Sequence, residues 1–329
     1  SVLFAACQCE LHTALQKHSL TNLVSEKDTR SLRKTERLYQ SALVHRRRLF
    51  RGKFPKAGLS VKVKRLHAID GKTQRGNGNK NQKGNHIVSA VDERGFCLGQ
   101  KRVEEKTNEI TAIPELIDSL NIKGTIITTD AMGTQTAIVK KIRKKRADYV
   151  LALKGNQGSL LEEVREYFSD GGLLKKCAYK KKVEKARGKI EKREYWQTED
   201  ISWLSQKKEW MGLKSIILTR NTITGADGKE TVEERYFISS LPTEIEETAR
   251  AVRGHWMIEN YHWHLDVTFR EDGNHTLEKQ AAYNLNIIRK LALNILKISE
   301  VGRCPMSMKK KRYAIGTNPE KYMDELMNL

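Results

Sequence analysis

The sequence feature that most constrains the fold is a series of short apolar, β-branched segments that alternates with helical segments between residues 64 and 170. Segments with apolar residues at helical spacing occupy residues 112–120, 134–145 and 159–168. Runs with the composition of strands occupy residues 64–70, 86–92, 96–103, 124–130 and 148–153. Because the first three strands form a meander and the later ones alternate with helices, the sequence predicts an α/β fold, an α+β mixed sheet with helices packed on it.

The alternation stops after residue 170, and the next stretch reads as a β-rich insertion. A basic run at 175–192 leads into three strand-like stretches, which occupy residues 191–199, 214–221 and 231–239. A helical pattern resumes after Pro242 and includes a last apolar helix at 284–298. The insertion is therefore expected to separate two parts of one core.

The sequence divides into five consecutive parts. The first has many basic residues but little apolar periodicity, which is typical of an arm that becomes ordered on a partner. The parts are a basic N-terminal segment at 1–64, the first part of the core at 65–170, the β-rich insertion at 171–241, a helical completion of the core at 242–300 and a basic, irregular C-terminal tail at 301–329.

The charge of the chain is the first indication of function. There are 61 Lys plus Arg against 40 Asp plus Glu, a formal net charge of +21. This excess favours a polyanionic partner, and nucleic acid is the usual one. The alternative is a solvated basic surface with no specific role. The sequence contains no apolar run long enough for a membrane helix and no secretory signal pattern, so an intracellular, membrane-free protein is expected.

Two aspartates stand out by their positions. Asp70 and Asp130 each end an apolar, β-rich run, so each is expected at the carboxyl end of a strand. Two such carboxylates on adjacent strands could share divalent metal ions, and a pair of metals activates a nucleophile and stabilises the leaving oxygen of a phosphodiester. The alternative is that each aspartate only forms a turn before small residues.

A third acidic residue lies in the helical segment 254–266, which is dense in histidine and tryptophan. Glu259 and Asp266 are seven residues apart and therefore share one helix face. The alternative is an amphipathic helix whose tryptophans, Trp256 and Trp263, pack on the core. His262 and Asp266 have the spacing of zinc ligands, but no further cysteine or histidine completes a set.

Several motifs in a fixed order resemble one family of proteins. They are Ala-Ile-Asp-Gly-Lys at 68–72, Thr-Thr-Asp-Ala-Met-Gly at 128–133, Ala-Leu-Lys-Gly-Asn-Gln at 152–157, His-Trp-Met-Ile-Glu-Asn at 255–260, Leu-Asp-Val at 265–267 and Glu-Asp at 271–272. With this ordered set the chain resembles bacterial insertion-sequence DDE transposases of the ISAs type, also called H-repeat-associated proteins. The resemblance covers about residues 66–329, whereas residues 1–64 do not share it.

The resemblance implies a ribonuclease H-like catalytic core interrupted by the β-rich insertion. It places Asp70 on the first core strand, Asp130 on the fourth and Glu259 on the helix after the insertion. These three residues are the expected catalytic and metal ligands, with Mg²⁺ as cofactor and Mn²⁺ able to substitute. The implied partners are double-stranded DNA, at the element ends and the target, and a second copy of the chain. The implied location is the bacterial cytoplasm, on the nucleoid.

The implied activity is metal-dependent strand cleavage at transposon ends and strand transfer to target DNA. Two rivals stay open: a nuclease on the same core that does not transpose, and an inactive DNA-binding remnant of a decayed element. Related transposases carry a Tyr-x-x-Arg-x-x-x-Glu-x-x-x-x-x-x-Lys pattern, of which only Glu259 is present here. Basic and aromatic side chains near the motifs and in the insertion are the candidate DNA contacts. These are Lys154, His255, Trp256, Lys180, Lys181 and Lys182.

Overall fold

The computed structural model describes residues 63–104, 108–186, 188–299, 301 and 305–322. Residues 1–62, which make up nearly all of the expected basic N-terminal segment, lie outside this range. None of the described helices is both long and apolar enough to cross a membrane.

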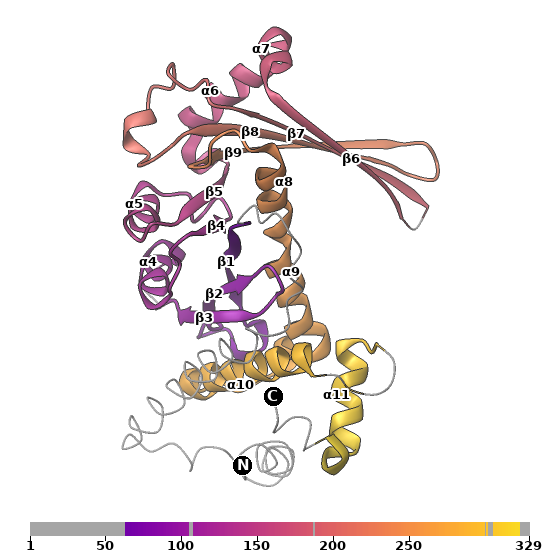
Figure 1. The fold of residues 1–329 in the computed structure, drawn as a ribbon. Coiled ribbons are helices and arrows are strands. Elements are labelled where there is room, and N and C mark those ends of the chain that lie inside the picture. The colour runs from indigo at the N-terminus through magenta and orange to yellow at the C-terminus, as the bar shows by residue number, and fades with distance from the viewer. Residues whose placement is uncertain (1–62, 105–107, 187, 300, 302–304, 323–329) are drawn as a thin grey trace. The chain divides into compact units, whose positions relative to one another are not determined.

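A nine-stranded mixed sheet organises residues 61–266 and 270–283, which form one compact unit (Figure 1). The strand order is β3-β2-β1-β4-β5-β9-β8-β7-β6. β1 pairs antiparallel with β2 and parallel with β4, which pairs parallel with β5. The first five strands are β1 (Arg65–Thr73), β2 (His86–Asp92), β3 (Cys97–Arg102), β4 (Thr125–Thr129) and β5 (Asp148–Leu153). All five were expected from the sequence, and the mixed α/β sheet is confirmed.

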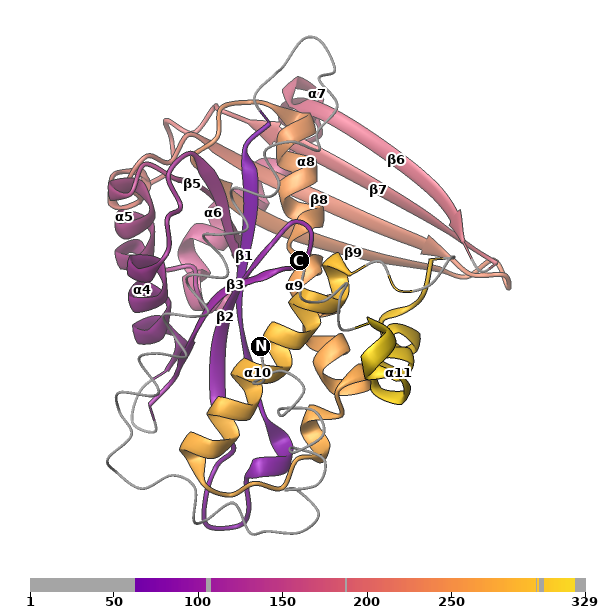
Figure 2. The ribbon, with the colours of Figure 1, turned by 60° about the horizontal axis from the view of Figure 1, so that its bottom comes forward.

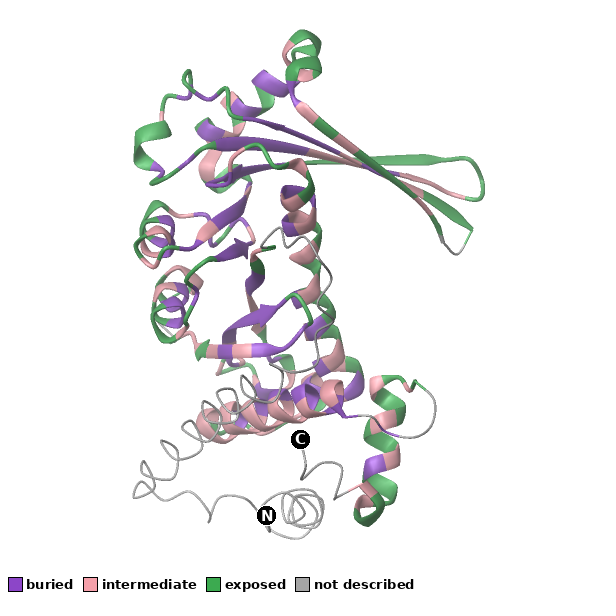
Figure 3. Ribbon diagram, in the orientation of Figure 1, coloured by how far each residue is buried: buried purple, intermediate pink, exposed green. Residues whose placement is uncertain are grey.

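The remaining strands form an antiparallel meander joined to β5 through β9. They are β6 (Ala178–Ala186), β7 (Lys189–Thr198), β8 (Ser215–Thr224) and β9 (Glu230–Ser239). Figure 2 shows these four strands side by side, extending away from β1. The four residues of β9 that pair with β5 are buried, whereas the other six are exposed (Figure 3). The sequence pattern missed β6, because its lysines hide the strand alternation.

Helices cover both faces of the sheet, which agrees with the continuous burial of β4 and the nearly continuous burial of β2. On one face Ile69 and Ile127 join a core with α4 (Glu109–Ser119), α5 (Thr136–Lys144) and α6 (Gly158–Ser169). On the other face Leu66 and Ile126 pack against α8 (Ile245–Gly254). Figure 1 shows α4 and α5 on one side of β1 and β4, with α8 on the other.

Helix α8 comes unusually close to β1 at its last residue, Gly254. A Cβ atom at this position would lie 2.1 Å from Cδ2 of Leu66, a buried side chain of β1. A larger residue at this position would require the buried Leu66 side chain, or the elements around it, to shift. The close packing fixes the start of α9 (Trp256–Trp263), which follows after one residue.

Three further α-helices are present among the described residues, besides several short 3₁₀ and π segments. They are the short helix α7 (Gly171–Lys176), α10 (Lys279–Ile298) and α11 (Met308–Thr317). Residues 267–269 and the described residues from 284 onward belong to a second compact unit. Within it, Leu296 of α10 and Ile315 of α11 share a small apolar cluster. The Lys311 ammonium donates to the backbone oxygens of Leu296 and Ser299, at 3.0 and 2.7 Å. The expectation of an irregular tail was therefore wrong for residues 308–317, because a lysine-rich segment can form a helix when its apolar side packs.

Candidate active site

Three carboxylates converge at the centre of the sheet. Asp70 lies on β1, Asp130 directly follows β4, and Glu109 is the first residue of α4. Because Ile69 pairs with Thr129 in the parallel register, the two aspartates follow neighbouring positions on adjacent strands. Carboxylate oxygens of the three residues all lie within 4.8 Å of one another. Asp70 lies within β1 rather than at its end, since the strand continues to Thr73.

The pKa values of the two aspartates in this cluster are raised. The pKa of Asp70 rises to about 7, first because the side chain is buried and then because Asp130 and Glu109 are negatively charged neighbours. Burial also raises the pKa of Asp130, although the Gly133 N–H, 3.2 Å from Oδ1, donates to this carboxylate and opposes the rise. A cluster of acids that repel one another in this way is a candidate for binding a cation.

The raised pKa of Asp70 predicts how the stability of the metal-free protein depends on pH. Between pH 3.8 and about 7, Asp70 keeps its proton in the folded protein but loses it in the unfolded chain. The folded state then binds more protons, so its stability falls as pH rises through this window. We expect a loss on the order of 2–4 kcal/mol. The melting temperature in EDTA, measured from pH 4 to 8, should show a fall that is absent in Asp70→Asn. Parallel curves for the two proteins would contradict the prediction.

Glu109 is the residue of this cluster that the sequence pattern missed. The predicted helix began at residue 112, so Glu109 seemed to precede it. The signal that could have found it is Asn108, whose side chain accepts from the Ile110 N–H at 3.0 Å and caps a helix that begins at Glu109. Oε1 of Glu109 lies 2.6 Å from Nε2 of His86, whereas its Oε2 is buried and has no hydrogen-bond partner among the described residues.

Glu259 lies on α9, next to the acidic cluster but outside it. Its side chain is exposed, and it is not one of the carboxylates within 4.8 Å of each other. Its negative charge nevertheless contributes to the raised pKa of Asp70. Glu259 also lines the same pocket as Asp130. The structure thus places the three sequence-predicted acids in one region, with Glu259 at its open side.

His262 of α9 and Asp266, which follows α9, contact residues of β1. Nδ1 of His262 is 3.7 Å from Oδ2 of Asp70. Asp266 follows α9 and makes an ion pair with Lys72 of β1 at 2.7 Å. In the described part of the chain, Asp70, Glu109 and Asp130 are the one group of three or more His, Cys, Asp or Glu side chains close enough to share a metal ion.

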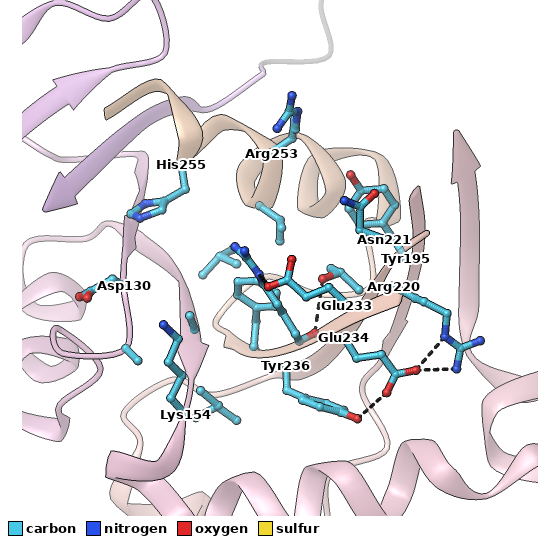
Figure 4. A pocket seen from close by; sticks show the side chains of 18 of the residues that line it. Asp130, Lys154, Tyr195, Arg220, Asn221, Glu233, Glu234, Tyr236, Arg253 and His255 are labelled. Atoms are coloured by element: carbon cyan, nitrogen blue, oxygen red, sulfur yellow. Dashed lines mark hydrogen bonds and ion pairs between the residues drawn. The ribbon is translucent and has the colours of Figure 1, made fainter. Parts of the chain in front are cut away.

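A pocket of about 550 Å³ opens beside these acids. Asp130, Glu259, Lys154 and His255 line it together with side chains from β7, β8 and β9 (Figure 4). Its lining holds six cationic side chains and as many carboxylates. The cations are Lys154, Arg165, Arg193, Arg220, Arg235 and Arg253. Some of these are neutralised locally. Arg193 pairs with Glu184 and Glu191, and Arg220 pairs with Glu234 at 2.7 Å.

An exposed tryptophan lines this pocket. Trp256 is 45% exposed, and the guanidinium groups of Arg235 and Arg253 lie 5.8 and 5.2 Å from its ring centroid. Trp263 is 53% exposed. The alternative that both tryptophans pack on the core is therefore wrong. An aromatic ring between two arginines suits a surface that binds a nucleic acid strand.

The candidate DNA contacts separate into two groups. Lys154, His255 and Trp256 line the pocket, whereas Lys180, Lys181 and Lys182 lie on β6 and do not. The side chain of Lys180 pairs with Glu246, and that of Lys182 pairs with Glu184 at 2.7 Å.

His255 is uncharged in this environment. Burial lowers its pKa to about 4, and its Nδ1 lies 3.0 Å from the Thr128 hydroxyl. At neutral pH the imidazole can therefore form hydrogen bonds, but it carries no positive charge that could neutralise an anion.

Comparison with known proteins identifies the class to which this fold and site belong. Residues 60–295 match the family model described as "Transposase DDE domain". This match covers well over half of the chain, so the chain belongs to the DDE transposase family. The resemblance noted in the sequence is thereby confirmed.

Three curated relatives come from Escherichia coli. "Putative transposase YncI" of strain O157:H7 is 38% identical over 271 residues, which cover 79% of this chain and 68% of that protein. From strain K12, "Putative protein YbfL" and "H repeat-associated putative transposase YhhI" are each 37% identical, over 264 and 260 residues. Each of these two alignments covers 76% of this chain and 69% of the relative.

Proposed function

We propose that this protein is a DNA transposase that cuts DNA at the ends of an insertion element and joins the freed ends to target DNA. The observation that carries the proposal is the convergence of Asp70 and Asp130 on adjacent strands, with Glu259 at the same site, in a chain of the DDE transposase family. These three residues are the proposed catalytic acids.

The proposed core is ribonuclease H-like. The strand order β3-β2-β1-β4-β5, with β2 antiparallel to its neighbours and β4 and β5 parallel to β1, supports this. Residues 171–241, which contain β6 to β9, are proposed to be an insertion into that core. Residues 242–300 return the chain to the site, because α8 packs on β1 and α9 supplies Glu259.

The donor set fits a hard divalent cation such as Mg²⁺, because every candidate ligand is a carboxylate oxygen. The buried Oε2 of Glu109 without a hydrogen-bond partner among the described residues, and the raised pKa of Asp70, are the features a missing cation would explain. Asp70, Asp130 and Glu259 would hold the metal, with Mn²⁺ able to replace Mg²⁺. When bound there, it would activate water for attack on a phosphodiester and stabilise the leaving oxygen.

The pocket supplies the DNA contacts in this proposal. Arg253 and Lys154 would neutralise backbone phosphates next to the acids, and Trp256 would stack on a base. His255, being neutral, would hold the strand by a hydrogen bond. Double-stranded DNA is the proposed substrate, at both the element end and the target. A dimer on DNA is proposed because two ends must be joined together.

Lys154 offers a direct test of the DNA path. Its side chain is exposed beside Asp130, and the Lys154→Ala variant should bind DNA more weakly at low salt. Because one phosphate contact is lost, the slope of log affinity against log salt concentration should fall by about 1. Lys208→Ala, which removes an exposed lysine that does not line the pocket, should leave affinity and slope unchanged. Fluorescence anisotropy with a labelled duplex measures both. Equal slopes for Lys154→Ala and the unmodified protein would remove Lys154 from the DNA path.

Strand transfer distinguishes the proposed function from its rivals. Labelled DNA with candidate element ends is incubated with Mg²⁺ and a target plasmid, using the unmodified protein and Glu259→Gln. Glu259 is exposed, so this variant should fold normally. Joined products that vanish in Glu259→Gln are the expected result. Cleavage without joining would favour a non-transposing nuclease, and DNA binding without any cleavage would favour an inactive remnant.

A further inference from the structure

We infer that Glu109 is a further carboxylate ligand of the metal site, oriented by His86, and that Asp70, Glu109 and Asp130 bind a divalent cation before DNA arrives and without Glu259. This inference rests on the proposed function, which places a metal at these acids. It adds a ligand from α4, whereas the proposed catalytic acids come from β1, from the end of β4 and from α9.

Geometry gives Glu109 a more central position than Glu259. Oxygens of Asp70, Glu109 and Asp130 all lie within 4.8 Å of one another, close enough to bind one cation after small adjustments. The Glu259 carboxylate is not part of this group and is exposed. The three carboxylates of this site therefore come from β1, the end of β4 and the start of α4, and none of them comes from α9.

The two oxygens of Glu109 have different environments. Oε1 lies 2.6 Å from Nε2 of His86, and Nδ1 of the same ring lies 2.7 Å from the Thr73 hydroxyl. Thr73 and His86 are paired across β1 and β2, so the histidine ring is held between two strands. Oε2 is buried and has no hydrogen-bond partner among the described residues. Since burying a charged oxygen without a partner is costly, a cation at Oε2 would explain the arrangement.

Gly71 makes room for this arrangement. A Cβ atom at Gly71 would lie 2.2 Å from Oε1 of Glu109 and 2.6 Å from Nε2 of His86. The absence of a side chain next to Asp70 therefore lets Glu109 and His86 reach the site together. Glu109 and His86 thus pack closely against Gly71. Such close packing would not be needed if Glu109 only began a helix or formed a surface ion pair.

Manganese binding to the full chain in the absence of DNA tests the inference. The electron paramagnetic resonance signal of free Mn²⁺ reports how much metal the protein binds. Glu109→Gln should weaken Mn²⁺ binding at least about tenfold, as expected for a lost ligand. Glu259→Gln should bind within about twofold of the unmodified protein. Glu115→Gln is a matched control on the same helix, because Glu115 is exposed and pairs only with Lys101 among the described residues.

Two results would overturn the inference: Mn²⁺ binding by Glu109→Gln that equals the unmodified protein, or a larger loss in Glu259→Gln. If Glu109→Gln fails to fold, by circular dichroism, His86→Gln takes its place. It should also weaken Mn²⁺ binding, and unchanged binding would count against the inference.

The outcome separates cleanly from that of the proposed function. Glu109-dependent Mn²⁺ binding without DNA cleavage would leave the ligand set intact and refute the transposase activity. Cleavage that depends on Asp70 and Asp130 but is unchanged in Glu109→Gln would support the proposed function and refute the role of Glu109 as a ligand.

Discussion

Asp70→Asn is expected to lose metal-dependent DNA cleavage by on the order of 10³-fold or more. Asp70 is one of the three carboxylates whose oxygens lie within 4.8 Å of one another, so the substitution removes one ligand of the proposed metal site. DNA affinity should change less than about threefold, because Asp70 does not line the arginine-rich pocket. Catalysis and binding are therefore expected to separate in this variant. Single-turnover cleavage and anisotropy, on the same labelled duplex, measure the two quantities.

The same substitution should not destabilise the metal-free protein. Burial first, and then repulsion from Asp130 and Glu109, raise the pKa of Asp70 to about 7. An asparagine side chain carries no charge, so neither its burial nor its neighbours would impose this cost. At pH 8 in EDTA, the variant should melt at a temperature equal to or above that of the unmodified protein. Asp118→Asn, a change of an exposed aspartate on α4, is a matched control that should keep full cleavage. Retention of cleavage by Asp70→Asn would remove Asp70 from the catalytic site.

Lys72→Met is expected to cause the largest loss of stability, about 3 kcal/mol. The Lys72 ammonium lies 2.7 Å from Asp266, 3.1 Å from Asp272 and 3.6 Å from Glu271. Lys72 is itself largely buried, and the Glu271 side chain has no exposed surface. Methionine preserves most of the side-chain volume but removes the charge. It would leave three carboxylates close together without their lysine.

Urea unfolding, followed by circular dichroism at pH 7, measures this effect. Lys101→Met is the matched control, because the Lys101–Glu115 pair is similar in length, 2.6 Å, but half exposed. Exposed pairs contribute little, so the control should lose less than about 1 kcal/mol. Equal losses in the two variants would show that Lys72 does not hold the segment after α9 to β1.

Lys72 also explains why the resemblance did not transfer at Asp266. Related transposases have a lysine at the position seven residues after the glutamate, whereas Asp266 occupies it here. In the structure Asp266 pairs with Lys72, which lies on β1 two residues after Asp70. Asp266 is thus negatively charged where the related transposases have a positive charge, and it pairs with Lys72 of the same chain. A role for Asp266 in binding phosphate is therefore not expected.

The core strands could be predicted from the sequence because burial on both faces gives them short, nearly continuous apolar and β-branched runs. The neighbouring positions of Asp70 and Asp130 also followed, since each ends or nearly ends an apolar run and parallel strands align such ends. β6 was missed because lysines occupy both of its faces, so that polarity carried no alternation. The strand exists because β7 pairs with it along its whole length.

The parts of the site that the sequence did not predict depend on contacts between distant segments. Glu109 reaches the aspartates only because α4 packs on the sheet. The Asn108 cap marks the start of that helix in the sequence, but it does not show that the helix begins next to Asp70 and Asp130. Similarly, Trp256 was open to two interpretations, core or surface. Arg235 lies 21 residues before Trp256 in the chain, and only the tertiary structure places it near that ring.

The central claim is that the acidic cluster cuts DNA with the help of a divalent metal. The most direct measurement is Mg²⁺- or Mn²⁺-dependent nicking of labelled DNA carrying candidate element ends, by the unmodified protein and by Asp130→Asn. We expect cleavage that requires the metal and disappears in the variant. Metal-dependent cleavage of equal rate in both proteins, or DNA binding without cleavage in either, would contradict the claim.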